Sequence, residues 1–165
     1  MDAVEASRLD RDAFVARFGG VFEGSPWIAA AAWAARPFAS TGELHAAMVR
    51  VVREAPREER LALIRAHPDL GTKARIGAES TREQATAGLD RLTPRQFERI
   101  TALMAAHRER FGFPFVVCAR EHTPDSIVAA AEARAGAAAE DEERTALAEI
   151  AKIARLRLDD LLEGP

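Results

Sequence analysis

Apolar side chains recur along this chain at intervals of three and four residues, and strict alternation of apolar and polar residues is almost absent. That period places apolar side chains on one face of an α-helix. The periodic segments are filled by Ala, Arg, Leu and Glu, which lose little side-chain freedom on entering a helix. The sequence therefore predicts an all-α protein, a bundle of about seven to nine helices.

Length and composition indicate a single domain over residues 1–165. A chain of 165 residues can bury a core without help from disulfides or metal. The sequence has no repeat of fixed period, no low-complexity linker and no break in composition. A run of small residues from Ala135 to Ala139 indicates a loop between the last two helices, within the same domain.

Hydroxyl residues and prolines mark several expected helix starts. Ser25, Thr93 and Thr123 each precede a proline, so the hydroxyl can cap the helix and the proline can occupy its first position. Thr41 is the expected cap of a further helix, which carries Leu44 and ends near Glu54.

Two longer segments predict helices that pack in the core, because each has a continuous apolar stripe. The first runs from Pro94 to Phe111 and the second roughly from Glu140 to Leu162. The side chains on the two stripes are Phe97, Ile100, Met104, His107 and Phe111 in the first helix, and Leu147, Ile150, Ala154 and Leu161 in the second.

Charge and composition argue against several classes of partner. A net charge of −3 gives no field that would attract nucleic acid. The longest apolar stretch, Trp27 to Ala35, is far shorter than the roughly 20 residues that cross a bilayer. A single cysteine, Cys118, cannot form an internal disulfide, and the N-terminus lacks the pattern of a signal peptide. We expect a cytoplasmic protein with no nucleic-acid and no membrane partner.

Metal and nucleotide motifs are not found either. His45, His107 and His122 lack the spacing of a zinc protease, and Cys118 with His122 forms no four-ligand pattern. The sequence has no phosphate-binding GxxxxGK and no nucleophile elbow. We therefore expect no metal ion in the site.

His67 is the first candidate for chemistry. A helix opened by Pro56 should end before it, since Pro68 disfavours the α conformation for the preceding residue. Two interpretations stay open: an imidazole that points into a cleft, or a surface histidine favoured at a helix C-terminus by the helix dipole. Sequence position alone favours the surface histidine.

The segment from Ser80 to Gln84 follows at short range. Ser80 and Glu83 have the spacing of a capping box, in which serine and glutamate bond each other's backbone amides at a helix start. The exposed amides of such a start also suit a carboxylate or a carbonyl-rich ligand. Alone, the segment is better explained as a cap only, and its proximity in sequence to His67 weakens that explanation.

An apolar segment from Phe111 to Ala119 should be extended, because Gly112 ends the preceding helix and Pro114 prevents its continuation. It either threads through the core or offers backbone amides and carbonyls to a polar heterocycle. Cys118 has no flanking signal for a nucleophile and is better explained as a small buried side chain.

Arg157 is an unexpected charge on an apolar stripe, beside Ile150, Ile153 and Leu161. A guanidinium there needs an anion or carbonyl partner. A structural ion pair is the simpler explanation, and a substrate carboxylate is the alternative.

Several ordered motifs run through nearly the whole chain: Ser25-Pro26-Trp27, Arg36-Pro37-Phe38, His67-Pro68-Asp69-Leu70, Ser80-x-x-Glu83-Gln84-x-x-x-Gly88-Leu89, Phe111-Gly112-Phe113-Pro114-Phe115 and Ile153-Ala154-Arg155-Leu156-Arg157-Leu158. With them the chain resembles the OHCU decarboxylases, which act on 2-oxo-4-hydroxy-4-carboxy-5-ureidoimidazoline in urate degradation.

The resemblance implies a role for each candidate residue. His67 would be the proton donor and Glu83 its carboxylate partner, which either orients the imidazole or accepts from the substrate hydroxyl. The product would be (S)-allantoin with CO2. The implied substrate-binding residues are Pro68, Ser80, Thr81, Arg82, Glu83, Gln84, Arg157 and the backbone of Phe115, Val116, Val117, Cys118 and Ala119.

The reaction implied by the resemblance needs no cofactor, because the substrate carries a C=N that accepts the electrons left by the departing carboxylate. The resemblance also implies a homodimer, to which Trp27, Trp33 and Phe38 would offer apolar contacts unless they are buried within one subunit. By the same resemblance, we expect the stretch between Pro68 and Ser80 to be shorter than in many members of that family.

Two other functions compete with a decarboxylase. The first is a noncatalytic helical domain that binds a ureide or a partner, with His67 as a helix-end residue and Glu83 as a cap. The second is a hydrolase of small ureides, with His67 activating water. It ranks last because the sequence shows no oxyanion hole and no metal site.

Overall fold

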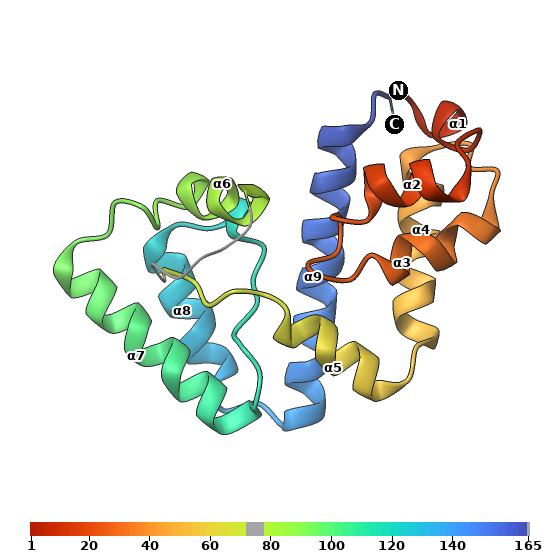
Figure 1. Ribbon diagram of the computed structural model, residues 1–165. Coiled ribbons are helices and arrows are strands. Elements are labelled where there is room, and N and C mark those ends of the chain that lie inside the picture. The colour runs from red at the N-terminus through yellow and green to blue at the C-terminus, as the bar shows by residue number, and fades with distance from the viewer. Residues whose placement is uncertain (72–77, 165) are drawn as a thin grey trace. The chain divides into compact units, whose positions relative to one another are not determined.

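The computed structural model describes residues 1–71 and 78–164. Within these residues the chain forms nine α-helices, two short 3-10 helices and no strand, which confirms the all-α prediction (Figure 1). Their bounds are α1 Ala3–Ala6, α2 Arg11–Phe18, α3 Trp27–Ala32, η1 Trp33–Ala35, α4 Thr41–Glu54, α5 Arg57–Arg65, α6 Ala78–Thr86, α7 Pro94–Phe111, η2 Ala119–Glu121, α8 Pro124–Arg134 and α9 Ala139–Leu161.

Contacts along the chain define two compact units. Unit 1 comprises Met1–Ala66 and Ala151–Pro165, and unit 2 comprises His67–Ile150. Helix α9 therefore begins in unit 2 and ends in unit 1. The organisation of residues 1–165 as one domain stays a prediction.

Unit 1 has an aromatic and aliphatic core. The ring of Phe14 lies 4.8 Å from that of Phe18 and stacks on Phe38 at 6.2 Å between centroids. Helix α4 buries Leu44 and Met48, one turn apart, and packs on α3. The two chain ends lie close together (Figure 1), with the Met1 amino group 3.6 Å from the Glu163 carboxylate.

Two predicted helix caps in unit 1 are wrong. Helix α3 begins at Trp27, and the Ser25 hydroxyl donates to the Glu23 carbonyl at 2.9 Å instead of accepting from a helix amide. Helix α4 is capped by Ser40, whose hydroxyl accepts from the Glu43 amide at 3.2 Å, while Thr41 is fully buried inside the first turn. Ser40 has the extended backbone that an N-cap requires.

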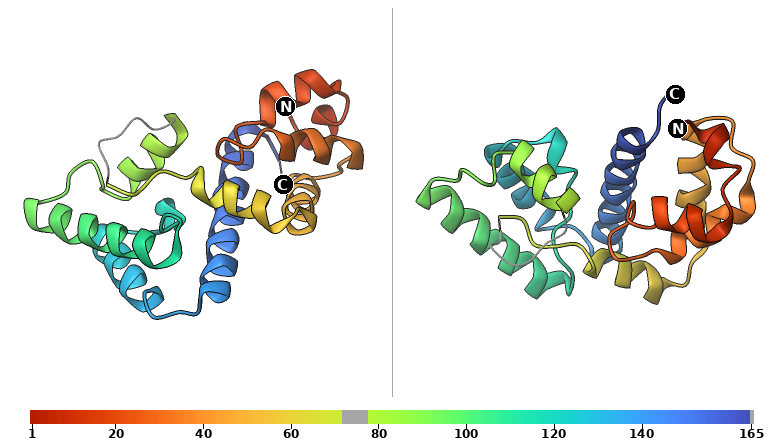
Figure 2. Two further views of the ribbon diagram at one scale, coloured as in Figure 1. Left: turned by 60° about the horizontal axis from the view of Figure 1, so that its bottom comes forward. Right: turned by 45° about the horizontal axis from the view of Figure 1, so that its top comes forward.

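Unit 2 contains the helix starts that were predicted correctly. Thr93 and Thr123 cap α7 and α8 in full capping boxes, each followed by proline. Helix α7 has the predicted bounds and lies beside α8 (Figure 2). Its predicted stripe is wrong at one end: Phe97, near the start of the helix, is 40% exposed, whereas Ile100 is buried.

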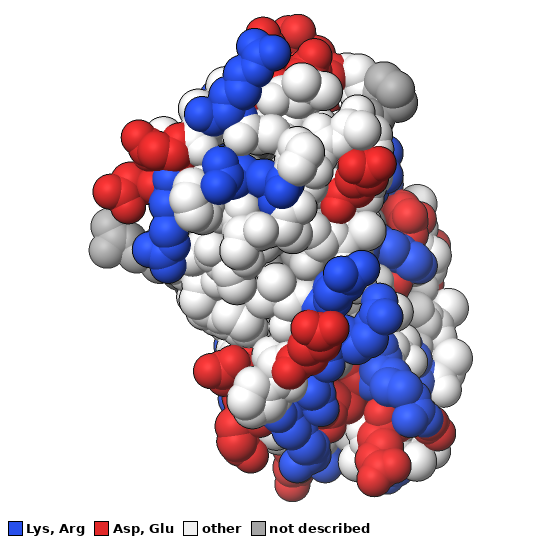
Figure 3. All heavy atoms as spheres, turned by 90° about the vertical axis from the view of Figure 1, so that its right-hand side faces the viewer, with Lys and Arg blue, Asp and Glu red and all other residues white. Residues whose placement is uncertain are grey.

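Basic and acidic side chains are interspersed on the face of the molecule shown in Figure 3. Across residues 1–71 and 78–164, no helix is both long and apolar enough to span a bilayer.

Candidate functional site

His67 is the first residue of unit 2 and is buried, with 6% of its surface exposed. The interpretation as a surface histidine is therefore wrong. Helix α5 ends at Arg65, before Pro68, and the chain then turns inward. Leu70 is buried in the core of unit 2, and the Asp69 carboxylate accepts from Arg108 of α7 at 3.0 Å. These two anchors keep the segment that carries His67 against the core.

Helix α6 begins at Ala78, so Ser80 lies within the helix and not at its N-cap. The predicted capping box is therefore wrong. A spacing of three residues also places two side chains on one face of a helix, and this is the case for Ser80 and Glu83. Ser80, Glu83 and Gln84 all lie on the buried face, and each is at most 7% exposed. Thr81 and Arg82 are exposed. The helix thus buries a serine, a carboxylate and an amide together.

Gln84 connects this buried face to the segment that begins at His67. Its side-chain oxygen accepts from the Gly71 backbone amide at 3.1 Å. Gly71 has a φ of +71°, which a residue with a side chain rarely adopts. The bond joins the His67–Gly71 segment to α6 across the interval 72–77. The predicted shortening of the loop between Pro68 and Ser80 falls mainly in that interval and lies outside the described residues.

Glu83 has a cationic neighbour that the sequence analysis missed. Arg120 Nε lies 3.7 Å from Glu83 Oε2, and the Glu83 side chain is 8% exposed. Arg120 belongs to η2, which packs against α6. Its position directly after Ala119, at the end of a segment already assigned to the site, was the signal that could have identified it.

The segment after α7 is extended and buried, as predicted, and threads through the core of unit 2. Its alternate residues Phe115, Val117 and Ala119 enter one apolar cluster with Leu70 and with Ala87 and Leu89, which follow α6. Cys118 is buried, as expected. The cluster brings together the segment that follows His67, the turn after α6 and residues 115–119.

Arg157 lies in unit 1, where it is 4% exposed. Its guanidinium pairs with the Glu23 carboxylate at 3.0 Å and donates to the Val21 carbonyl at 3.3 Å. These contacts agree with the structural ion pair that the sequence favoured. A contact with substrate stays a prediction.

A second polar cluster, also missed from sequence, lies in the core of unit 2. His107 Nε2 is 2.9 Å from the Glu142 carboxylate, which is fully buried and also paired with Arg134. Burial alone would raise the pKa of Glu142, but the hydrogen bonds from His107 and Arg134 outweigh it and lower that pKa below its usual value. Arg134 also donates to the Val116 carbonyl at 2.8 Å. We refer to His107, Glu142 and Arg134 as the core triad.

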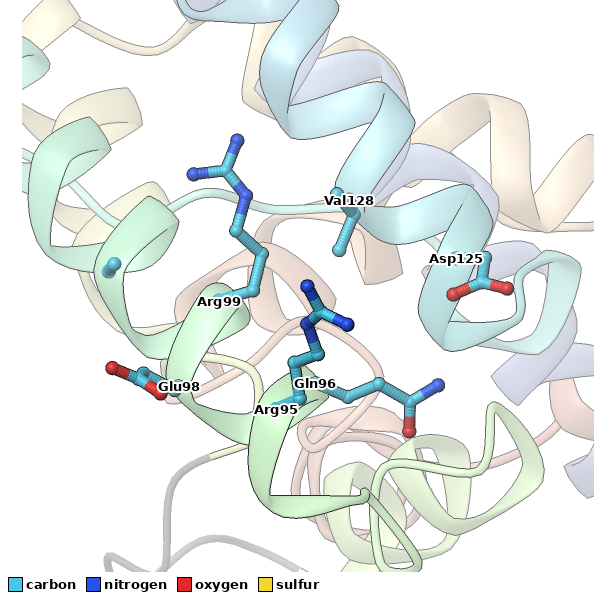
Figure 4. A pocket seen from close by; sticks show the side chains of 7 residues that line it. Arg95, Gln96, Glu98, Arg99, Asp125 and Val128 are labelled. Carbon is cyan, nitrogen blue, oxygen red and sulfur yellow. The ribbon is translucent and has the colours of Figure 1, made fainter.

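A surface groove of about 480 Å³ lies along α7 and α8 (Figure 4). None of the predicted site residues lines it, and one of its two arginines, Arg99, already pairs with Glu132. The groove is lined by Arg95, Gln96, Glu98, Arg99, Ala102, Asp125 and Val128.

No group of three or more His, Cys, Asp or Glu side chains suited to a metal ion occurs within the described ranges.

Comparison with known proteins covers nearly the whole chain. A family model described as OHCU decarboxylase matches residues 7–159. The chain is 48% identical to a 2-oxo-4-hydroxy-4-carboxy-5-ureidoimidazoline decarboxylase of Haloferax volcanii, over 93% of this chain and 92% of that protein. It is 39% identical to a uric acid degradation bifunctional protein of Bacillus subtilis, over 96% of this chain and 32% of that protein.

A solved structure has the same fold. The crystal structure of an (S)-allantoin synthase matches with a TM-score of 0.79 at 27% identity, over 98% of this chain and 54% of that chain. Both compact units are therefore included in the structural match.

Proposed function

Because the chain belongs to the OHCU decarboxylase family, we propose that it decarboxylates 2-oxo-4-hydroxy-4-carboxy-5-ureidoimidazoline to (S)-allantoin, with His67 as the proton donor. It is a carboxy-lyase of urate degradation. The observation that carries the assignment of His67 is the bond from Gly71 to Gln84, which ties the segment of a buried histidine to the face of α6 that holds a buried carboxylate.

The reaction places modest demands on the protein. The bond to the carboxylate carbon breaks, CO2 leaves, and the electron pair passes into the C=N of the substrate ring. One proton must then reach one face of the ring, which fixes the handedness of the product. A histidine that titrates near neutrality is suited to supply it, and a buried position excludes competing water.

The buried face of α6 supplies the polar groups that hold the substrate in this proposal. Ser80 and Gln84 offer hydrogen bonds to the ureido group and ring, and Glu83 orients the imidazole or accepts from the substrate hydroxyl. The backbone of residues 115–119 lies in the same apolar core and is proposed to bind the opposite edge. The assignments of Pro68, Thr81, Arg82 and Arg157 stay predictions.

The test is decay of freshly generated substrate, with the handedness of allantoin followed by circular dichroism. Wild type should accelerate the decay and give the S product, whereas His67→Ala should show the spontaneous rate and a racemic product. His45→Gln is the matched control, since His45 bonds the Ala151 carbonyl in unit 1. Equal turnover by wild type and His67→Ala would contradict the role of His67, and persistence of bound substrate with wild type would favour a binding domain.

The homodimer and the cytoplasmic location are further proposals. Trp27 and Trp33 are partly exposed and support an apolar contact between subunits. Phe38 does not, because it is buried within unit 1 against Phe14. Light scattering of the purified protein tests the dimer: a monomer mass would refute it. The single cysteine supports a reducing compartment.

A further inference from the structure

We infer that Arg120 is a positioning residue for the decarboxylation: its guanidinium holds the Glu83 carboxylate in a fixed orientation. The inference rests on the proposed function, in which Glu83 is the carboxylate of the site. Arg120 acts through Glu83 and is not itself assigned to the substrate.

Burial is the first argument. The Glu83 side chain is 8% exposed, and a carboxylate removed from water to that extent is strongly unfavourable without a compensating cation. Arg120 supplies this cation at 3.7 Å from Nε to Oε2, with 26% of its own side chain exposed. A guanidinium is always charged at physiological pH, so its compensation does not vary with pH as that of a histidine would.

The rigidity of its support is the second argument. Arg120 is the middle residue of η2, whose turn is closed by amide bonds from Glu121 to the Cys118 carbonyl and from His122 to the Ala119 carbonyl, both at 3.0 Å. Ala119 is buried in the apolar cluster of unit 2. The packing of η2 against α6 therefore holds the cation and the carboxylate on two elements that share one core.

The pair also implies different roles for Glu83 and His67. A carboxylate paired with a guanidinium is held as a hydrogen-bond acceptor. Glu83 then serves as a fixed acceptor, whether for the imidazole of His67 or for the substrate hydroxyl, and the transferred proton belongs to His67. Arg120 follows directly after the backbone proposed to bind the substrate ring, so the same turn positions both.

The activity test compares three variants by kcat and KM. Arg120→Gln should lower kcat by about 10- to 100-fold, the cost of a misplaced group, with KM changed by less than about threefold. Arg120→Lys restores a cation without the planar fork and should recover part of the loss. Arg99→Gln, which removes a surface ion pair with Glu132, should match wild type. Wild-type kcat in Arg120→Gln, or an equal loss in Arg120→Lys, would overturn the inference.

A double-mutant cycle on thermal unfolding tests the pair itself. Introduced into the wild-type protein, Arg120→Gln should lower the melting temperature by a few degrees, because it removes the guanidinium beside a buried carboxylate. In a Glu83→Gln background the same change should have little effect. An equal decrease in both backgrounds would show that Arg120 acts independently of Glu83 and would refute the inference. Failure of the proposed function is seen separately, as a wild-type protein that does not accelerate decarboxylation.

Discussion

Unit 2 contains two sets of a histidine, a glutamate and an arginine, and their contacts differ. One set is the core triad, and the other consists of the proposed site residues His67 and Glu83 with Arg120. The core triad of His107, Glu142 and Arg134 joins its members by direct contacts, with the Glu142 side chain completely buried. In the site, Glu83 and Arg120 are 3.7 Å apart and the arginine is 26% exposed. The core triad is thus joined by direct contacts in the interior, whereas the pair of Glu83 with Arg120 is longer and partly exposed, which is compatible with the role that we propose for it in the reaction.

The surroundings of His107 show why the core triad is structural. Its ring has Nε2 facing the Glu142 carboxylate and Nδ1 facing the Phe113 carbonyl at 3.2 Å. The rings of Phe111 and Phe115 lie 4.6 and 5.5 Å away. Both nitrogens face acceptors of the protein, and aromatic rings pack around the imidazole. The triad stabilises the extended segment that the site uses.

The largest effect on stability should come from Glu142→Gln. Removing one charge from a buried, hydrogen-bonded set leaves the other charges uncompensated, and we expect a loss of about 3–5 kcal/mol in the free energy of unfolding. Glu83→Gln should cost about 1 kcal/mol or less, because the neutral amide removes a desolvation cost together with an ion pair.

Urea unfolding and the decarboxylation assay together check this contrast. Glu83→Gln should lose activity while it remains folded, and Glu142→Gln should lose stability first. A Glu83→Gln variant as unstable as Glu142→Gln would show that the two sets do not differ in function.

Acid should weaken the core triad. The pKa of Glu142 is lowered in the folded protein, so its contribution is present above the unfolded value of 4.5 and is lost as pH falls through the folded pKa. The difference in unfolding free energy between wild type and Glu142→Gln should therefore narrow below pH 4.5. Urea titrations at several pH values measure it, and a difference that widens on acidification would contradict the sign of the shift.

Local chemistry explains which parts of the fold were predictable. The caps at Thr93 and Thr123 were correct because the hydroxyl, the proline and the residue three positions on all lie in the same turn. The pattern at Ser80 failed because an interval of three residues is equally compatible with a helix interior. Position in the sequence does not distinguish the two cases, since the start of α6 depends on where its buried face packs.

The sequence did not predict which residues of distant elements pair with one another. The partners His107 and Glu142 are 35 positions apart, and the pair of Glu83 with Arg120 joins two elements that only the fold brings together. The motifs nevertheless predicted His67 and Glu83 as site residues, and both are buried in the same unit. A motif predicts which groups a site uses, whereas the counter-ions beside them depend on packing.

The smallest expected effect comes from replacing two glycines of unit 2 by alanine. Comparing the two variants separates backbone strain from loss of function. Gly71 and Gly112 have φ values of +71° and +78°, so alanine at either position should cost about 1–2 kcal/mol. A Cβ at Gly71 would meet only ordinary contacts at 3.5 Å, and one at Gly112 would meet nothing within 4 Å. Only Gly71 donates to Gln84 on the buried face of α6.

At equal loss of stability, Gly71→Ala should therefore lower kcat several-fold more than Gly112→Ala does. The reason is that Gly71→Ala disturbs the connection between the His67 segment and α6. Gly112→Ala, with a similar unfolding free energy, should keep nearly full activity at a temperature where both variants are folded. If the two variants lose the same fraction of activity, the decrease reflects stability alone, and the bond from Gly71 to Gln84 has no part in aligning His67 with the carboxylate of the site.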